Sequence, residues 1–160
     1  MNMAQSSPKE YTYHLEDSKP ILFDLYTPES YSPTTNTYKT LILYHGGGLV
    51  SANRRIIPTT VVSSIREKNW LVISPDYHLL PESGLQDIRN DAEALENWLL
   101  KCHEEIGVDL ENVAIGGASS GKWPSRWRAR EVFLFHTTVL IIYRLIRRHT
   151  FMHNLEIYSS

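Results

Sequence analysis

Three short runs of consecutive apolar residues constrain the fold of this chain most. They read TLILYHGGG, LVISPDY and NVAIGG, and they begin at Thr40, Leu71 and Asn112. Runs of this kind are typical of strands buried on both faces of a parallel sheet. Two weaker strand patterns, YTYHLE and ILFDLY, precede them.

Helical patterns separate these runs. One helix is expected over about Asn53 to Asn69, with Pro58 in or near its first turn. A second is expected between Leu85 and Ile106, where apolar residues recur every three or four positions and Gly107 is placed to end the helix. Strands that alternate with helices predict an α/β fold with a largely parallel sheet.

The chain changes character at Gly121. Its 160 residues carry a net charge of −2, but residues 1–121 hold nine Lys and Arg against sixteen Asp and Glu, a balance of −7. Residues 122–160 hold seven against two, a balance of +5, and contain none of the eight glycines. We therefore expect the N-terminal part of a domain over 1–121 and an atypical basic tail over 122–160. We interpret this tail as the product of a shifted reading frame or of intron read-through.

Several classes of protein do not fit this sequence. Cys102 is the single cysteine, which excludes a disulfide framework and a cysteine-rich zinc site. The N-terminus has no signal-peptide pattern, and the longest apolar stretch (132–143) is shorter than the roughly 20 residues of a spanning helix. We expect a cytoplasmic protein without a transmembrane segment. No recognisable nucleic-acid-binding motif accompanies the arginines of the tail, and nothing in the sequence sets an oligomeric state.

The sequence GGASSG, residues 116–121, follows the third apolar run and contains the pattern G-x-S-x-G from Gly117 to Gly121. A strand-to-helix turn of this kind exposes a serine, here Ser119, on a strained backbone between small neighbours. The alternative is a glycine-rich turn without chemistry.

The sequence HGGG, His45 to Gly48, follows the first apolar run. Consecutive glycines expose backbone N–H groups, which in acyl transfer can bind the tetrahedral oxyanion. The alternatives are a phosphate-binding loop and a plain turn. A phosphate-binding loop would need Lys-Ser/Thr after the glycines, and Leu49-Val50 follow instead.

Four motifs in order resemble the hormone-sensitive-lipase-like branch of the α/β-hydrolase superfamily. They are HGGG, PDYHLLPE from Pro75, DIRNDAEALENWL from Asp87, and GGASSG. In the second motif His78 stands where arginine is usual. The resemblance covers roughly residues 10–121 and implies a truncated α/β-hydrolase fold whose C-terminal strands are missing.

The resemblance also implies a mechanism. Ser119 would attack a carboxylic ester, and the backbone N–H groups of Gly47, Gly48 and Ser120 would form the oxyanion hole. His45 and Gly46 would support the loop, and Gly117 and Gly121 would flank the nucleophile elbow. The substrate would be a small-molecule ester, and neither a metal nor an organic cofactor is implied.

The histidine and acid that complete such a site follow the serine in this fold. After Gly121 the only acids are Glu131 and Glu156, and the only histidines are His136, His149 and His153. None lies in a context that resembles the family's acid or histidine loops, and His14, His78 and His103 are expected to be surface or loop residues. The pattern S-x-x-K at Ser119–Lys122 lacks the motifs that accompany a serine–lysine site.

Three hypotheses follow from this gap. The first is an esterase by ancestry that is incomplete and weakly active or inactive. The second is a non-catalytic binding or regulatory protein derived from a hydrolase. The third is a membrane-surface protein that uses Arg144, Arg147 and Arg148 beside an apolar run.

Overall fold

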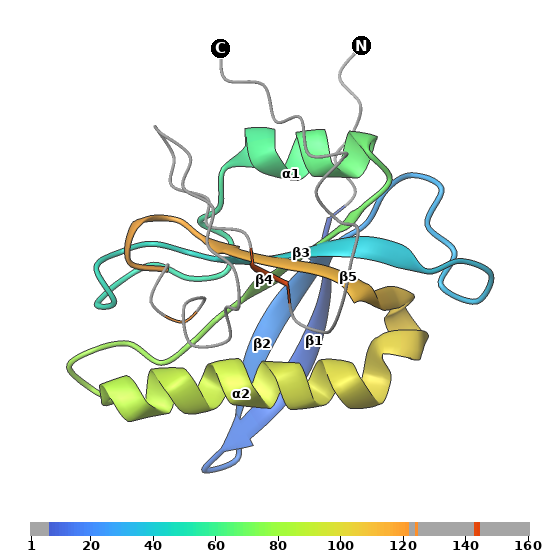
Figure 1. Cartoon of the computed structure of the whole chain (residues 1–160). Helices are drawn as coiled ribbons and strands as arrows, with labels where there is room; N and C mark the ends of the chain where they lie inside the picture. The colour runs from blue at the N-terminus through green and yellow to red at the C-terminus, as the bar shows by residue number, and fades with distance from the viewer. Residues whose placement is uncertain (1–6, 122–123, 125–142, 145–160) are drawn as a thin grey trace.

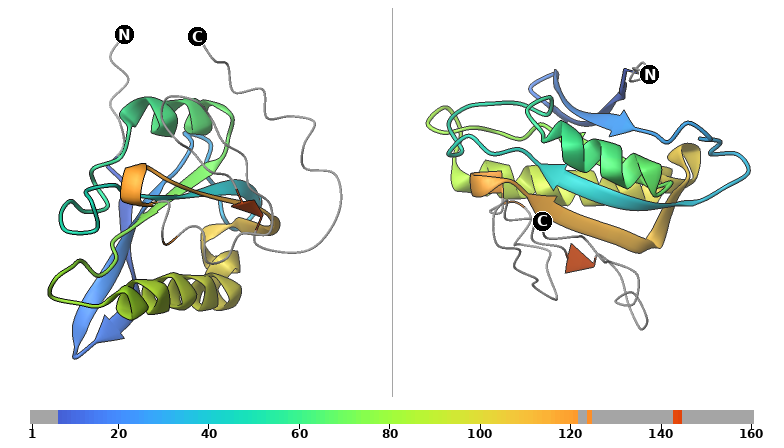
Figure 2. Two further views of the ribbon diagram at one scale, coloured as in Figure 1. Left: turned by 60° about the vertical axis from the view of Figure 1, so that its left-hand side comes forward. Right: turned by 90° about the horizontal axis from the view of Figure 1, so that it is seen from above.

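The computed structural model of the chain describes residues 7–121, 124 and 143–144, apart from the side chains of Ile65, Tyr143 and Arg144. In this part of the chain one mixed sheet lies between two helices, with α1 on one face and α2 on the other (Figures 1 and 2). The order of the strands in the sheet is β1-β2-β4-β3-β5-β6. The strands are β1 (Lys9–Glu16), β2 (Lys19–Tyr26), β3 (Tyr38–Tyr44), β4 (Leu71–Pro75), β5 (Val108–Gly117) and β6 (Tyr143–Arg144).

The strands β4, β3 and β5 form a parallel centre, and β1 and β2 add an antiparallel hairpin on the side of β4. All five residues of β4 and six of the seven in β3 are buried, which is the reason why their sequences lack an apolar–polar alternation. The expected α/β fold with strands at these runs is therefore confirmed. Tyr143 and Arg144 pair antiparallel with Ile115 and Ala114 of β5.

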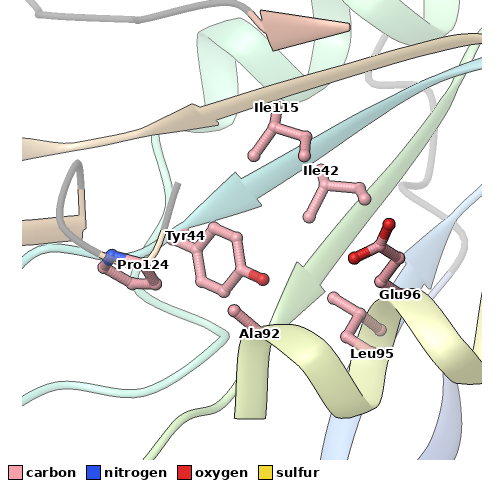
Figure 3. A pocket seen from close by; sticks show the side chains of 7 residues that line it. All are labelled: Ile42, Tyr44, Ala92, Leu95, Glu96, Ile115 and Pro124. Atoms are coloured by element: carbon pink, nitrogen blue, oxygen red, sulfur yellow. The ribbon is translucent and has the colours of Figure 1, made fainter. Parts of the chain in front are cut away.

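The longer helix packs against one face of the sheet and forms most of the core. α2 (Leu85–Cys102) continues as a 3-10 turn (His103–Ile106) and ends at Gly107, whose φ of +66° gives the left-handed conformation expected there. Figure 3 shows how Ile42, Tyr44 and Ile115 of the sheet face Ala92 and Leu95 of α2 across a cavity of about 10 Å³, the size of one water molecule.

The shorter helix begins later than the sequence predicted. α1 (Thr59–Glu67) follows Pro58, and residues 53–58 form a loop instead of the first turns of the helix. The side chain of Asn53 accepts a hydrogen bond from the backbone N–H of Arg55, which favours a turn at this point. The backbone of Arg54 is bound to Asp76 and Ser74 of a neighbouring segment. These contacts replace the hydrogen bonds that a helix over 53–58 would make.

The order of the central strands determines where a site can form. The chain passes from β3 through α1 to β4 on one side, and then through α2 to β5 on the other side of β3. In parallel sheets, ligands bind at the carboxyl ends of strands where the order reverses in this way. The HGGG loop follows β3, and the GGASSG sequence ends β5 and forms the turn after it, so both of them lie at this point.

Candidate functional site

The HGGG loop is fixed by the ring of its own His45 and by the ring of Tyr77. His45 is 1% exposed, and its Nδ1–H donates to the carbonyl oxygen of Gly46 at 2.8 Å. The ring of Tyr77 stacks on the His45 ring with 4.2 Å between centroids, and the Tyr77 hydroxyl donates to the carbonyl oxygen of His45 at 2.8 Å. Burial lowers the pKa of His45, so its ring is neutral at pH 7. This histidine therefore fixes the conformation of the loop.

The glycines of this loop adopt positions that a side chain would block. Gly47 has a φ of +109°, and a Cβ there would lie 2.1 Å from the carbonyl oxygen of Ser51. At Gly46 a Cβ would lie 2.9 Å from the carbonyl oxygen of Ala118 and 3.3 Å from Cβ of Ser119. The loop therefore crosses directly over the GGASSG turn.

Two backbone donors of the loop are unused within the described part of the chain. No residue there accepts a hydrogen bond from the N–H of Gly47 or of Gly48. The φ of Gly48 is +68°, also in the left-handed region. Donors without an internal acceptor, beside a serine, are the arrangement that binds a developing oxyanion.

Ser119 lies on a strained turn at the carboxyl end of β5. Its φ is +50°, a value that non-glycine residues adopt at a cost of about 1–2 kcal/mol. The N–H of Ala118 donates to the carbonyl oxygen of Tyr44 at 3.0 Å. The N–H of Gly121 donates to the carbonyl oxygen of Ala118 at 2.9 Å. The first bond ties the turn to the end of β3, and the second closes the turn on itself.

Ser120 links the turn to the far end of the glycine loop. Its hydroxyl oxygen accepts a hydrogen bond of 3.2 Å from the backbone N–H of Leu49. Burial raises the pKa of Tyr77 to about 12, although a hydrogen bond with the Ser120 side chain opposes this shift. Ser120 thus contacts both the glycine loop and the tyrosine beneath it, which the sequence motif alone did not predict.

The residues that could complete a catalytic triad are not assembled in the described part of the chain. No histidine there is hydrogen-bonded to Ser119. The tail candidates Glu131, His136, His149, His153 and Glu156 lie outside the described residues. That part of the chain also contains no group of three or more His, Cys, Asp or Glu that could hold a metal ion.

His78 lies in a loop as expected, but its side chain is only 19% exposed and is ion-paired. Its Nδ1 is 2.9 Å from Oδ2 of Asp91, which is buried on α2, and its backbone N–H donates to the same oxygen at 2.7 Å. Its Nε2 is paired with Glu16 at the end of β1. His78 therefore connects the β1–β2 hairpin to α2.

This cluster predicts a pH-dependent stability. Burial lowers the pKa of His78, but Asp91 and Glu16 outweigh it, so the pKa is raised above the usual 6.5. Such a group stabilises the fold fully below pH 6.5, and this contribution is lost as the pH rises through the folded-state pKa. We expect the free energy of unfolding to fall between pH 6 and pH 8, as measured by urea denaturation.

His78→Arg is the matched variant, because an arginine stays charged over this range. In this variant the free energy of unfolding should decline less between pH 6 and pH 8. The control is His14→Gln, which removes another histidine whose charge acts on Asp91. An unchanged decline in His78→Arg would show that another group titrates.

The comparisons with known proteins agree with this geometry. Residues 41–122, about half of the chain, match the model of a family described as the alpha/beta hydrolase fold. The chain belongs to this family. The resemblance stated from the HGGG and GGASSG motifs is therefore confirmed.

Individual relatives are longer than this chain. The sequence is 27% identical over 124 residues to a probable carboxylesterase, M8, of Phoma sp., which is 70% of this chain and 39% of the relative. It is 30% identical over 108 residues to the non-reducing polyketide synthase Preu3 of Preussia isomera, 63% of this chain and 4% of that protein.

Solved structures give the same result. A bacterial heroin esterase superposes with a TM-score of 0.63 at 28% identity, over 72% of this chain and 36% of that one. Thermogutta terrifontis esterase 2 superposes with a TM-score of 0.65 over 74% of this chain and 44% of that one, and at 18% identity it supports the fold alone. The chain thus spans less than half the length of each of these four proteins.

Proposed function

We propose that residues 1–121 carry the nucleophile and the oxyanion-binding groups of a carboxylic ester hydrolase. The observation that carries this proposal is the approach of the glycine loop to the strained serine, where a Cβ at Gly46 would lie 3.3 Å from that of Ser119. The positive φ exposes the serine for attack on a carbonyl carbon, and the unused N–H groups beside it can bind the oxyanion of the tetrahedral intermediate that forms.

The proposed reaction follows from these groups. Oγ of Ser119 attacks the carbonyl carbon of a small-molecule ester, and the electron pair of the C=O double bond moves to the oxygen. The N–H groups of Gly47, Gly48 and Ser120 bind this oxyanion, and each donor is worth about 10²–10³ in rate. Collapse of the intermediate expels the alcohol, and water then releases the acid from the acyl-enzyme.

The hydroxyl of Ser119 must lose its proton during the attack, so the reaction needs a proton acceptor. The presence or absence of this acceptor distinguishes a hydrolase from a non-catalytic protein. A site with oxyanion donors but an incomplete triad retains about 10³–10⁴-fold catalysis over water in a serine protease. The absence of a histidine bonded to Ser119 among the described residues favours a second candidate, a non-catalytic binding protein derived from a hydrolase.

Labelling with a fluorophosphonate distinguishes these functions. We expect covalent labelling of the intact chain, located at Ser119 by peptide mass spectrometry. Ser119→Ala should abolish it, whereas Ser64→Ala, at an exposed position on α1, should leave it unchanged. A chain that unfolds cooperatively but is not labelled would reject the hydrolase site and support the binding protein.

In the described part of the chain, no helix combines the length and apolar character needed to cross a membrane. The division into a hydrolase part (1–121) and a basic tail (122–160) is part of the same proposal. Its support is the family match, which ends at residue 122, where the charge balance of the sequence also changes.

A further inference from the structure

A second cavity lies between α1 and the β1–β2 hairpin. Its volume is about 530 Å³, within the range of roughly 300–1,000 Å³ of small-molecule sites. The residues that line it include none from the HGGG loop or the GGASSG turn. It is therefore separate from the proposed hydrolase site.

The local structure explains which side chains reach this cavity. Glu10 of β1 pairs directly with Asp24 of β2, so both point to the same face of the sheet, and Tyr26 follows two residues later on that face. Thr59 and Val62 lie one turn apart on α1 and form the opposite wall. The cavity thus has carboxylates and an aromatic ring on one side and a helix face on the other.

Asp24 provides an unused acceptor at this cavity. Its side chain is 2% exposed, and its Oδ1 accepts a hydrogen bond of 2.7 Å from Nε of Arg54. Its Oδ2 is buried and has no hydrogen-bond partner among the described residues. Nε of Arg55 is 3.9 Å from this oxygen, which is too far for a hydrogen bond. A buried carboxylate oxygen without a hydrogen bond is unfavourable, so a ligand that donates a hydrogen bond to it would be stabilised.

The charges around the cavity balance, which favours a neutral ligand. The negative charges of three carboxylates are matched by the positive charges of three guanidinium groups. The carboxylates are Glu10, Asp24 and Asp76. The guanidinium groups are Arg54, which contacts all three carboxylates, and the cavity residues Arg55 and Arg66. An additional full charge would disturb this balance.

One hydroxyl group can bridge Asp24 and Arg55 once the Arg55 side chain, which is 70% exposed, turns aside to admit it. A hydroxyl both donates and accepts, and two hydrogen bonds of about 2.8 Å can bridge atoms 3.9 Å apart. The ring of Tyr26 and the side chains of Ile57 and Val62 supply apolar surface for the carbon part of the ligand. A phenol matches both features, because its acidic hydroxyl is a strong donor to a carboxylate.

We propose that this cavity binds a small phenol, whose hydroxyl donates to Oδ2 of Asp24 and accepts from the guanidinium of Arg55 while its ring contacts Tyr26 and Val62. This site does not depend on the activity of Ser119.

The test uses 4-fluorophenol as the probe, observed by fluorine NMR with the full chain. We expect saturable binding, and we expect 4-fluorotoluene, which lacks the hydroxyl, to bind at least about tenfold more weakly, the size of one hydrogen bond to a charged group. Arg55→Met should weaken the phenol by a similar factor and leave 4-fluorotoluene unchanged. Arg55 is 70% exposed, so this variant should fold.

A pair of variants locates the site. Thr59→Trp fills the cavity from an exposed position and should abolish binding, whereas Thr60→Trp changes the neighbouring exposed residue, which does not line the cavity, and should bind normally. Circular dichroism verifies that both variants are folded. The proposal is wrong if the folded chain does not bind 4-fluorophenol, if 4-fluorotoluene binds equally well, or if Thr59→Trp still binds.

Discussion

Gly121→Ala is expected to destabilise the protein by more than about 3 kcal/mol, above the usual range for an overpacked site. A Cβ at this position would lie 2.3 Å from the carbonyl oxygen of His45 and 2.5 Å from that of Tyr44. Both are backbone atoms, and the oxygen of Tyr44 also accepts the hydrogen bond from Ala118. No flexible side chain can move aside, so the turn would have to separate from β3.

The measurement is the free energy of unfolding from urea denaturation, followed by circular dichroism. Gly84→Ala is the matched control, because a Cβ there would meet only Oδ2 of Asp87 at 3.5 Å and the N of Gln86 at 4.0 Å. Its cost should be about 1 kcal/mol or less, the scale of a changed helix cap. If Gly121→Ala were as mild as Gly84→Ala, the close packing of the turn on β3 would be refuted.

The parts of the fold that the sequence predicted well are those with a local physical cause. β3, β4 and β5 lie at continuous apolar runs because both faces of these strands are buried. α2 shows a clear helical period because one face of it packs on the sheet, with Ile88, Leu95 and Leu99 almost fully buried.

The start of α1 was predicted wrongly for a reason that lies elsewhere in the chain. Residues 53–58 have no strong helix breaker before Pro58, yet the N–H of Arg54 is bound to Oδ1 of Asp76 at 2.7 Å. A contact between residues 22 positions apart leaves no periodic pattern in either segment.

The same distinction applies to the candidate site. The motifs predicted where the turns lie, and the positive φ values of Gly47, Gly48 and Ser119 are local properties of these turns. The contact of Ser120 with Leu49 and the ion pairs of His78 join residues far apart in sequence, so they became visible only in the fold. The prediction that later strands are missing concerns residues outside the described part and stays a prediction.

Arg54 is the centre of the most buried charge cluster in the described part of the chain, and Arg54→Met is expected to cost about 3–5 kcal/mol. The Arg54 residue is 9% exposed and Asp24 is 1% exposed. Burial opposes the positive charge, but hydrogen bonds with Asp24 and Asp76 raise the pKa of Arg54 above its usual value. Removal of the guanidinium would leave the Asp24 carboxylate buried without a compensating charge at bonding distance, and this uncompensated charge is the cause of the loss.

Two further variants separate the buried charge from lost packing. Arg55→Met removes a guanidinium that is 70% exposed and 3.9 Å from Asp24, so it should change stability by less than about 1 kcal/mol. The double variant Arg54→Met with Asp24→Asn removes both charges and should recover part of the loss, as measured by a double-mutant cycle in urea. If the double variant were as unstable as the sum of the single variants, the side chain of Arg54 would stabilise the fold through its packing, and the ion pair with Asp24 would contribute nothing.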